Sequence, residues 1–103
     1  MQNQLLKPEE LETLLKAFPK WEHDDECLRR FFEFQDFKEA FDFMIQVAEI
    51  AETLDHHPDW SNSWNKVSIQ ISTHSAGGLT HLDHRFVERS NQLLGIRKLH
   101  IIL

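Results

Sequence analysis

Residues 36–54, DFKEAFDFMIQVAEIAETL, form the most strongly periodic segment of the sequence, and they are predicted to be one long helix. The core-facing stripe of this helix is expected to comprise Phe37, Ala40, Phe41, Met44, Ile45, Ala48 and Ala51. A second apolar stripe beside it comprises Phe43, Val47, Ile50 and Leu54. A helix this apolar either packs through a wide face or has its second stripe covered by another chain.

A run of alternating residues predicts the main strand. Residues 64–74 place Val67, Ile69 and Ile71 on one side and polar residues on the other. A polar turn is expected just before this strand, at residues 61–63. Further upstream, residues 21–23 and 27–34 are predicted to form a β-hairpin around the polar turn at residues 24–26. A strand with one dry and one wet face is typical of an antiparallel sheet that helices cover on one side.

Start and stop signals for helices complete the predicted order of elements. Pro8 suits the first position of a helix that Pro19 ends. Thr80 is expected to begin the last helix with Asp83 as its capping-box partner, and Gly95 is expected to cap the other end. The order α-β-β-α-β-β-α predicts an α+β fold, a four-stranded antiparallel sheet with three helices packed on one face.

Charge and cysteine content limit the possible classes of function. With 11 Lys and Arg against 17 Asp and Glu, the net charge of −6 repels phosphate backbones, so direct nucleic-acid binding is not expected. Cys27 has no partner for an internal disulfide, which favours a reducing compartment. Because we find neither a signal peptide nor an apolar run of about 20 residues, we expect a cytoplasmic protein without membrane contact. Residues 1–103 are expected to form a single domain, with residues 96–103 as a C-terminal tail.

The stretch DHHPDW, residues 55–60, contains two adjacent histidines that could take part in catalysis. His56, His57 and His74 all lie at the edges of predicted elements, where side chains reach a cleft. An imidazole with a pKa of about 6.5 donates and accepts protons at neutral pH, so these residues suit general acid–base work. Structural explanations remain open, because histidines are favoured at helix C-termini, Pro58 blocks a helix and Asp83 caps one.

Other kinds of chemistry fit the sequence less well. His56, His57, His74 and Asp83 could bind a metal, but their spacing matches no helical HExxH motif, and neighbouring residues in an extended segment point to opposite sides. No metal site is therefore expected. Cys27 has no histidine near it in sequence, and the chain has no nucleophile elbow and no phosphate-binding glycine loop. Proton transfer without covalent or metal help is the remaining hypothesis.

Residues 52–83, ETLDHHPDWSNSWNKVSIQISTHSAGGLTHLD, resemble the signature of the pterin-4a-carbinolamine dehydratases, and the resemblance extends over most of residues 9–94. It implies a dehydratase that removes water from a 4a-hydroxytetrahydropterin and gives quinonoid dihydropterin. The reaction belongs to pterin recycling after aromatic amino acid hydroxylation. The resemblance implies no metal and no organic cofactor.

The resemblance also implies roles for individual residues. His56 and His74 are expected to transfer protons at the two faces of the pterin ring, and His57 to bind and orient it. The remaining residues implied at the substrate site are Glu52, Asp55, Pro58, Trp60, Thr73 and Asp83. Of these, the three carboxylates are expected to orient the imidazoles, and Trp60 to form an apolar wall beside the ring.

Convergence of the histidines is expected to need a bend in the chain. In a plain hairpin over residues 59–66, His74 is expected some seven residues beyond the position opposite His57, or about 23 Å away at the usual rise. A bend near residues 60–64, or another strand pairing, is therefore expected.

A protein-binding module is the alternative function. Animal members of the family that the chain resembles also serve as dimerisation cofactors of a homeodomain transcription factor, through the apolar face of the long helix. Phe43, Val47 and Ile50 are expected to form that surface here, more readily in a homodimer or homotetramer than with a hydroxylase or transcription-factor partner. A role beside the molybdenum-cofactor pathway also stays open.

Overall fold

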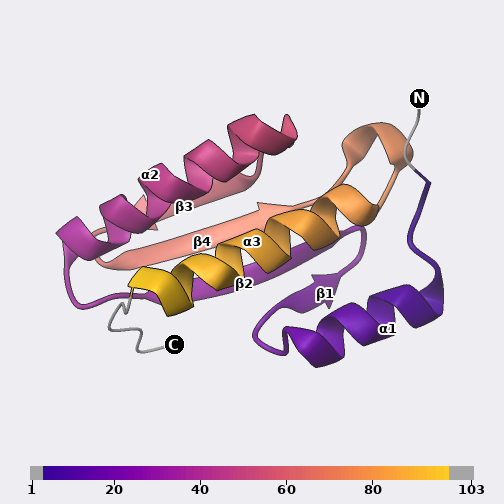
Figure 1. The fold of residues 1–103 in the computed structure, drawn as a ribbon, viewed down its shortest axis with the longest axis horizontal. Coiled ribbons are helices and arrows are strands. Elements are labelled where there is room, and N and C mark those ends of the chain that lie inside the picture. Colours follow the sequence, from indigo (N-terminus) through magenta and orange to yellow (C-terminus); the bar gives the residue numbers. More distant parts are fainter. Residues whose placement is uncertain (1–3, 98–103) are drawn as a thin grey trace.

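The computed structural model describes residues 4–97 of the chain. Its helices are α1 (Pro8–Ala17), α2 (Phe37–Leu54) and α3 (His81–Arg97), and its strands are β1 (Glu22–Asp24), β2 (Cys27–Glu33), β3 (Asp59–Ser63) and β4 (Lys66–Ile71). A short 3-10 helix, η1 (His74–Ala76), follows β4. The four strands form one antiparallel sheet in the order β1-β2-β4-β3, and the three helices lie on one face of it (Figure 1). The predicted α+β fold is confirmed.

The hairpin of β3 and β4 is tighter than the sequence suggested. Ser63 pairs with Lys66, so residues 61–63 belong to a strand, and the prediction of a polar turn there was wrong. The turn consists of Trp64 and Asn65, with Trp64 in the left-handed region at a φ of 51°. The Asn65 side chain donates a hydrogen bond of 2.9 Å to the carbonyl of Phe34, which fixes the turn against the end of β2.

The core forms between the sheet and the helices around a group of phenylalanines. Phe43 of α2 packs against Phe32 and Phe34, with ring centroids 4.8 and 5.1 Å apart. The predicted dry face of β4 is confirmed, because Val67, Ile69 and Ile71 are all buried there. Arg30 lies over the Phe32 ring at 4.4 Å, and burial lowers the pKa of its guanidinium to about 10.

Helix α2 faces the sheet with residues from both predicted stripes, Ala40 and Ala51 from the first and Phe43 and Val47 from the second. Ala40, Phe43, Val47 and Ala51 are buried, whereas Phe37, Phe41 and Ile45 are 44%, 46% and 47% exposed. The predicted core stripe was therefore wrong for the latter three residues. Phe43 and Val47, two of the three residues predicted to form the protein-binding surface, are buried and inaccessible to a partner, whereas Ile50 is only partly buried. Both stripes have helical spacing, so periodicity does not choose between them; the packing of Phe43 against two phenylalanines of the sheet does.

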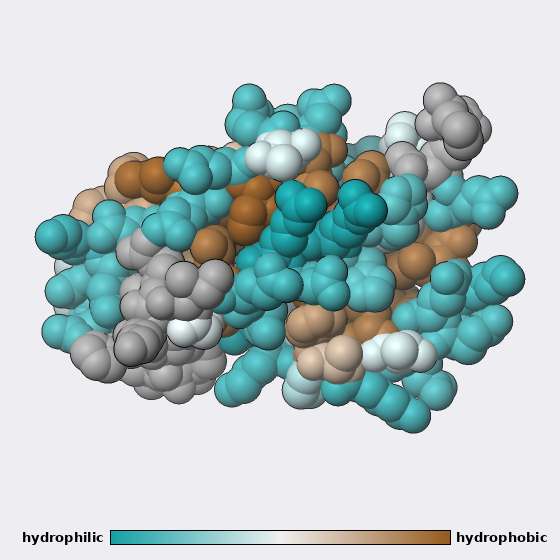
Figure 2. Space-filling model, in the orientation of Figure 1, coloured by the Kyte–Doolittle hydropathy of each residue, from teal (hydrophilic) through white to brown (hydrophobic). Residues whose placement is uncertain are grey.

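The exposed apolar residues of α2 stay together on the surface. Phe37 and Phe41 stack with their ring centroids 5.4 Å apart, and Ile45 follows one turn later. Figure 2 shows brown side chains gathered over α2, at the upper left of this view. We call Phe37, Phe41 and Ile45 the outer stripe.

Helix α3 begins as predicted but ends later. The Thr80 backbone N–H donates to the Asp83 carboxylate at 2.8 Å, and the Leu82 N–H donates to the Thr80 hydroxyl at 3.2 Å, which confirms the predicted N-terminal cap. The helix continues through Gly95 to Arg97, so the predicted cap at Gly95 was wrong. Residues 98–103, most of the predicted tail, lie outside the described residues. Within residues 4–97, no helix is long and apolar enough to cross a membrane.

The two stripes of α2 are expected to contribute differently to stability. Phe43→Ala should lower the free energy of unfolding by about 3–5 kcal/mol, because it leaves a cavity in the aromatic core. Phe41→Ala, two residues away on the same helix, should cost about 1 kcal/mol or less. Urea unfolding at two protein concentrations measures both values and separates any effect of association. Equal losses in the two variants would contradict the observed orientation of α2.

Candidate active site

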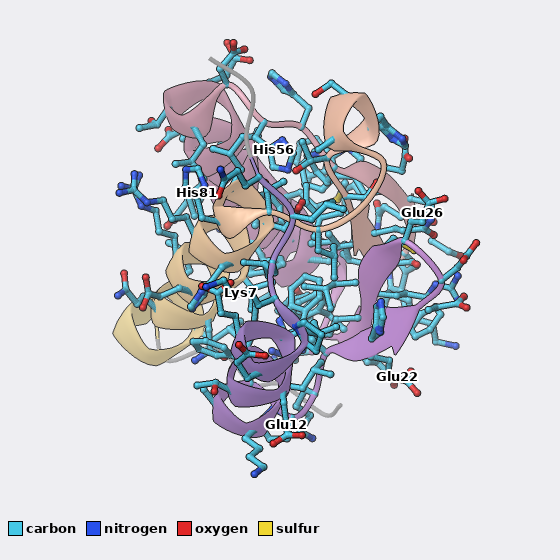
Figure 3. All side chains as sticks on the ribbon, turned by 90° about the vertical axis from the view of Figure 1, so that its right-hand side faces the viewer. Lys7, Glu12, Glu22, Glu26, His56 and His81 are labelled. Carbon is cyan, nitrogen blue, oxygen red and sulfur yellow. The ribbon has the colours of Figure 1, made fainter. Side chains whose placement is uncertain are left out.

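The candidate site lies at one end of the sheet, where α2 ends and α3 begins. The C-terminal end of α2, the end of β4 and the loop that leads to α3 meet there, as the ribbon shows (Figure 1). In Figure 3, which faces this end of the molecule, His56 lies close to the end of α2 and to the orange loop before α3. Residues far apart in the sequence therefore share one small region.

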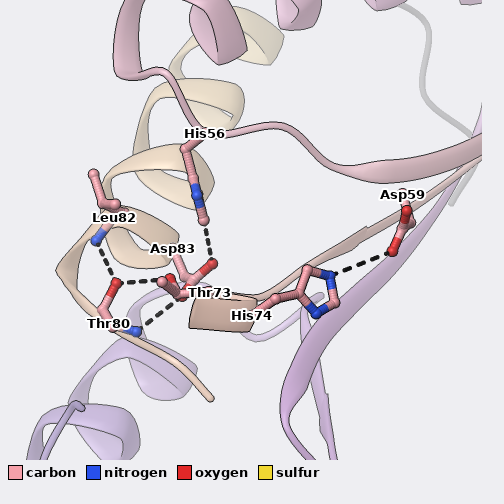
Figure 4. Close-up of polar contacts among 7 residues, drawn as sticks. All are labelled: His56, Asp59, Thr73, His74, Thr80, Leu82 and Asp83. Carbon is pink, nitrogen blue, oxygen red and sulfur yellow. Dashed lines mark hydrogen bonds and ion pairs between the residues drawn. The ribbon is translucent and has the colours of Figure 1, made fainter. Parts of the chain in front are cut away.

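His56 is held in the interior by the way α2 ends. Asp55 adopts a left-handed conformation at a φ of 50°, and the N–H of His56 donates to the carbonyl of Ala51 at 2.9 Å. This C-terminal cap turns the chain inward. The His56 imidazole is consequently buried, and its Nε2 lies 2.7 Å from Oδ1 of Asp83 (Figure 4).

Asp83 accepts hydrogen bonds from three different segments. Besides His56, its carboxylate accepts from the Thr73 hydroxyl at 2.7 Å and from the Thr80 backbone N–H at 2.8 Å. The side chain is fully buried. An ionised carboxylate only accepts hydrogen bonds, so Nε2 of His56 must carry the hydrogen. In the neutral imidazole, Nδ1 is then the nitrogen with the free lone pair.

His57 points the other way and forms a separate pair on the surface. Its Nε2 lies 2.6 Å from Oε2 of Glu52, which belongs to the last turns of α2. Both side chains are exposed. The structure therefore places Glu52 beside His57 and not beside His56.

His74 is the first residue of η1, and its imidazole is exposed. Its Nε2 lies 3.9 Å from Oδ2 of Asp59, the first residue of β3 (Figure 4). We did not predict this carboxylate partner, although Asp59 lies within DHHPDW. Its proximity to His74 depends on the strand register.

That register removes the need for a bend. Asp59 pairs with Gln70, and continuing the register by two residues places position 57 opposite position 72. His74 therefore lies two residues beyond that position, and the expected offset of seven residues was wrong. A plain hairpin brings His74 to the end of the molecule that holds His56.

The other predicted substrate-site residues fall into different environments. Thr73 is buried and bound to Asp83, and Pro58 is half-buried. Asp55 is exposed and caps α2. Trp60 packs against the hydrophobic core, among the residues between sheet and helices. Part of the Trp60 side chain remains exposed to solvent.

A polar pocket of about 360 Å³ opens beside His74, on the face of the sheet away from the helices. Its lining comprises His74, Ser72, Gln70, Arg29, Cys27, Gly78 and the turn at residues 24–26. His56 and His57 do not line it, so this pocket by itself does not bring the three histidines together. Burial raises the pKa of the Cys27 thiol, which makes it a poor nucleophile at neutral pH. Among residues 4–97, no three His, Cys, Asp or Glu side chains lie close enough to hold a metal ion.

The sequence and fold match those of known proteins. Residues 4–93 match the family model described as pterin 4 alpha carbinolamine dehydratase. A relative in Prochlorococcus marinus is 43% identical over 88 residues, which cover 85% of this chain and 92% of the relative. Another in Rhizorhabdus wittichii is 49% identical over 85 residues, covering 81% and 88%. Both are provisionally named as pterin-4-alpha-carbinolamine dehydratases.

Two solved structures share the fold. The crystal structure of a transcriptional coactivator/pterin dehydratase from Brucella melitensis is 40% identical, with a TM-score of 0.83 over 87% of this chain and 98% of that one. A pterin dehydratase-like RuBisCO assembly factor of the alpha-carboxysome is 20% identical, with a TM-score of 0.60 over 73% and 87%, and supports the fold alone. The match over residues 4–93 shows that the chain belongs to the pterin 4 alpha carbinolamine dehydratase family.

Proposed function

We propose that the histidine–carboxylate pairs at this end of the sheet carry out the proton transfers of a pterin dehydratase. Family membership makes the protein a hydro-lyase that acts on a 4a-hydroxytetrahydropterin and gives quinonoid dihydropterin. Our assignment of residues rests on one observation. Each of three imidazoles lies within 4 Å of a carboxylate. The pairs are His56 with Asp83, His57 with Glu52, and His74 with Asp59.

The reaction needs one proton donor and one proton acceptor. The bond from C4a to the hydroxyl oxygen breaks while the N5 lone pair forms a double bond to C4a. An acid protonates the departing oxygen, which leaves as water, and a base removes the proton from N5. No electrons are exchanged with another reagent, so two positioned imidazoles supply everything the step requires.

His56 is suited to act as the base. Its Nε2–H is bound to Asp83, so proton uptake at Nδ1 produces an imidazolium beside a buried carboxylate, which stabilises the new charge. This is the division of labour between the histidine and aspartate of a catalytic triad. The buried setting also holds the ring in a single orientation.

His74 is suited to act as the acid, and His57 to bind the ring. His74 lies on the rim of the polar pocket, and its Nε2 is 3.9 Å from Oδ2 of Asp59. His57 is exposed and held by Glu52, so it presents a fixed hydrogen-bonding edge to a ligand.

Single substitutions should separate these roles. His56→Ala and His74→Ala are each expected to lower kcat by about 10²- to 10⁴-fold, because each removes a proton-transfer group. His57→Ala should mainly raise KM. Stopped-flow decay of the 4a-hydroxytetrahydropterin measures kcat and KM for each variant. His23→Ala, in β1, is the control. Wild-type turnover in the His56→Ala/His74→Ala double variant would refute the assignment.

Metal removal should leave the reaction unchanged. The proposed steps use only imidazole protons, so dialysis against a chelator is expected to alter neither kcat nor KM. The same stopped-flow assay before and after dialysis makes the comparison. A rate that falls on dialysis and returns with one added divalent cation would contradict the proposed chemistry.

A second function, self-association through α2, is favoured by the outer stripe. We propose that Phe37, Phe41 and Ile45 are covered by the same stripe of a second copy. Three half-exposed apolar side chains on successive turns, two of them stacked, form a surface that matches itself about a two-fold axis. The Brucella structure is named as a transcriptional coactivator as well as a dehydratase, so a different partner protein is the alternative occupant.

A charge on the outer stripe should break the association. Phe41→Glu is expected to shift the sedimenting species to the monomer, because it places a carboxylate in an apolar interface. Gln46→Glu adds the same charge on another side of α2 and should leave the species unchanged. A wild-type protein that sediments as a monomer at all concentrations would refute self-association. A different partner protein would then be the occupant of the outer stripe.

The remaining expectations stay predictions. We infer a reducing compartment such as the cytoplasm, because Cys27 has no partner cysteine in the sequence. A hydroxylase partner and a role related to the molybdenum-cofactor pathway are likewise kept as predictions.

A further inference from the structure

Thr80 takes part in more contacts than a helix cap requires. Its side chain is fully buried at the point where the loop after β4 enters α3. Its hydroxyl oxygen lies 2.8 Å from the hydroxyl oxygen of Thr73 and accepts the N–H of Leu82 at 3.2 Å. Only the second of these bonds belongs to a cap.

The hydrogens in this group have one consistent arrangement. The Thr73 hydroxyl has a single proton and lies 2.7 Å from Oδ2 of Asp83, which can only accept, so Thr73 donates to Asp83. The bond between the two threonine hydroxyls must then be donated by Thr80. The result is a directed chain in which Thr80 donates to Thr73 and Thr73 donates to Asp83 (Figure 4).

This chain ends on the carboxylate that holds His56. Hydrogen bonds in series polarise one another, and inside a protein each one restricts the orientation of the next. Oδ2 of Asp83 is occupied by Thr73 and the Thr80 backbone, so Oδ1 is left for Nε2 of His56. Thr73 also immediately precedes His74 in the sequence, so the same series of hydrogen bonds anchors the start of η1.

The backbone of Thr80 is fixed from the opposite side. Leu5 forms an isolated antiparallel bridge with Thr80, and the N–H of Leu6 donates to the carbonyl of Leu79 at 2.8 Å. The N-terminal segment therefore crosses the loop just before α3. With its backbone held in this way, the Thr80 hydroxyl has little freedom to move.

We propose that Thr80 is a positioning residue for the dehydration. Its hydroxyl fixes Thr73 and Asp83, and through them holds the His56 imidazole in one pose, hydrogen-bonded through its Nε2–H with the Nδ1 lone pair free. The effect on the rate rests on the proposed role of His56 as the base, whereas the effect on the hydrogen bond between His56 and Asp83 does not.

Substitutions of Thr80 test whether its hydroxyl is needed for turnover. Thr80→Val keeps the shape and removes the donor, and it should lower kcat by about 10-fold or more with KM nearly unchanged, because the base loses its fixed pose. Thr80→Ser keeps the donor and should retain kcat to within about twofold. Thr80→Ala tests the same bond if valine prevents folding. Asp36→Ala removes the N-terminal cap of α2, whose carboxylate accepts the N–H of Glu39 at 2.9 Å, and controls for loss of a helix cap away from the site.

A spectroscopic measurement separates this inference from the proposed function. In NMR of the imidazoles, the Nε2–H of His56 should exchange slowly with water in the wild type and in Thr80→Ser, and faster in Thr80→Val, where its hydrogen bond to Asp83 is loosened. An unchanged exchange rate in Thr80→Val would overturn the proposal, whatever its kcat. Faster exchange with unchanged kcat would uphold the positioning of His56 and refute its role as the base.

Discussion

The candidate site depends on a single buried carboxylate. An ionised carboxylate taken out of water without partners costs several kcal/mol, so Asp83 is tolerated in the interior only because it is fully engaged. Its partners are His56 after α2, Thr73 after β4 and Thr80 before α3. The need to satisfy one negative charge therefore ties together three segments that are distant in the sequence.

The hydrogen bonds to Asp83 explain how a small protein can hold its candidate site in place within segments that have no regular secondary structure. The residues after α2 and around η1 lack the repeating hydrogen bonds of regular structure, and such segments are usually mobile. Here they are cross-linked by short, charge-assisted hydrogen bonds, which are about twice as strong as neutral ones. Loss of any one partner leaves the charge under-solvated, so the group behaves as a unit.

The sequence predicted the features that depend on local spacing. The alternation of Val67, Ile69 and Ile71 identified the dry face of β4, and the interval from Thr80 to Asp83 identified the start of α3. The orientation of α2 was not predictable, because its two apolar stripes have the same spacing and only contact with the sheet distinguishes them. The left-handed turn at Trp64 was missed because tryptophan rarely adopts that conformation.

The contacts within the candidate site were also not predictable, because they join segments that are distant in the sequence. Residue types and family resemblance identified the three histidines and Asp83. The pairing of His74 with Asp59 follows from strand register, and the link from Thr80 to Thr73 joins residues on opposite sides of a loop. The alternation of β3 packs part of Trp60 against the core, and its expected place beside the ligand stays a prediction.

The orientation of α2 has a further consequence for how such a protein can evolve. Phe41 and Phe43 are two positions apart, yet one contacts solvent and the other the aromatic interior. If the outer stripe binds a second chain as proposed, substitutions there would change which proteins bind to α2 without disturbing the aromatic core that holds the fold together. The two sides of one helix would then be free to diverge at different rates.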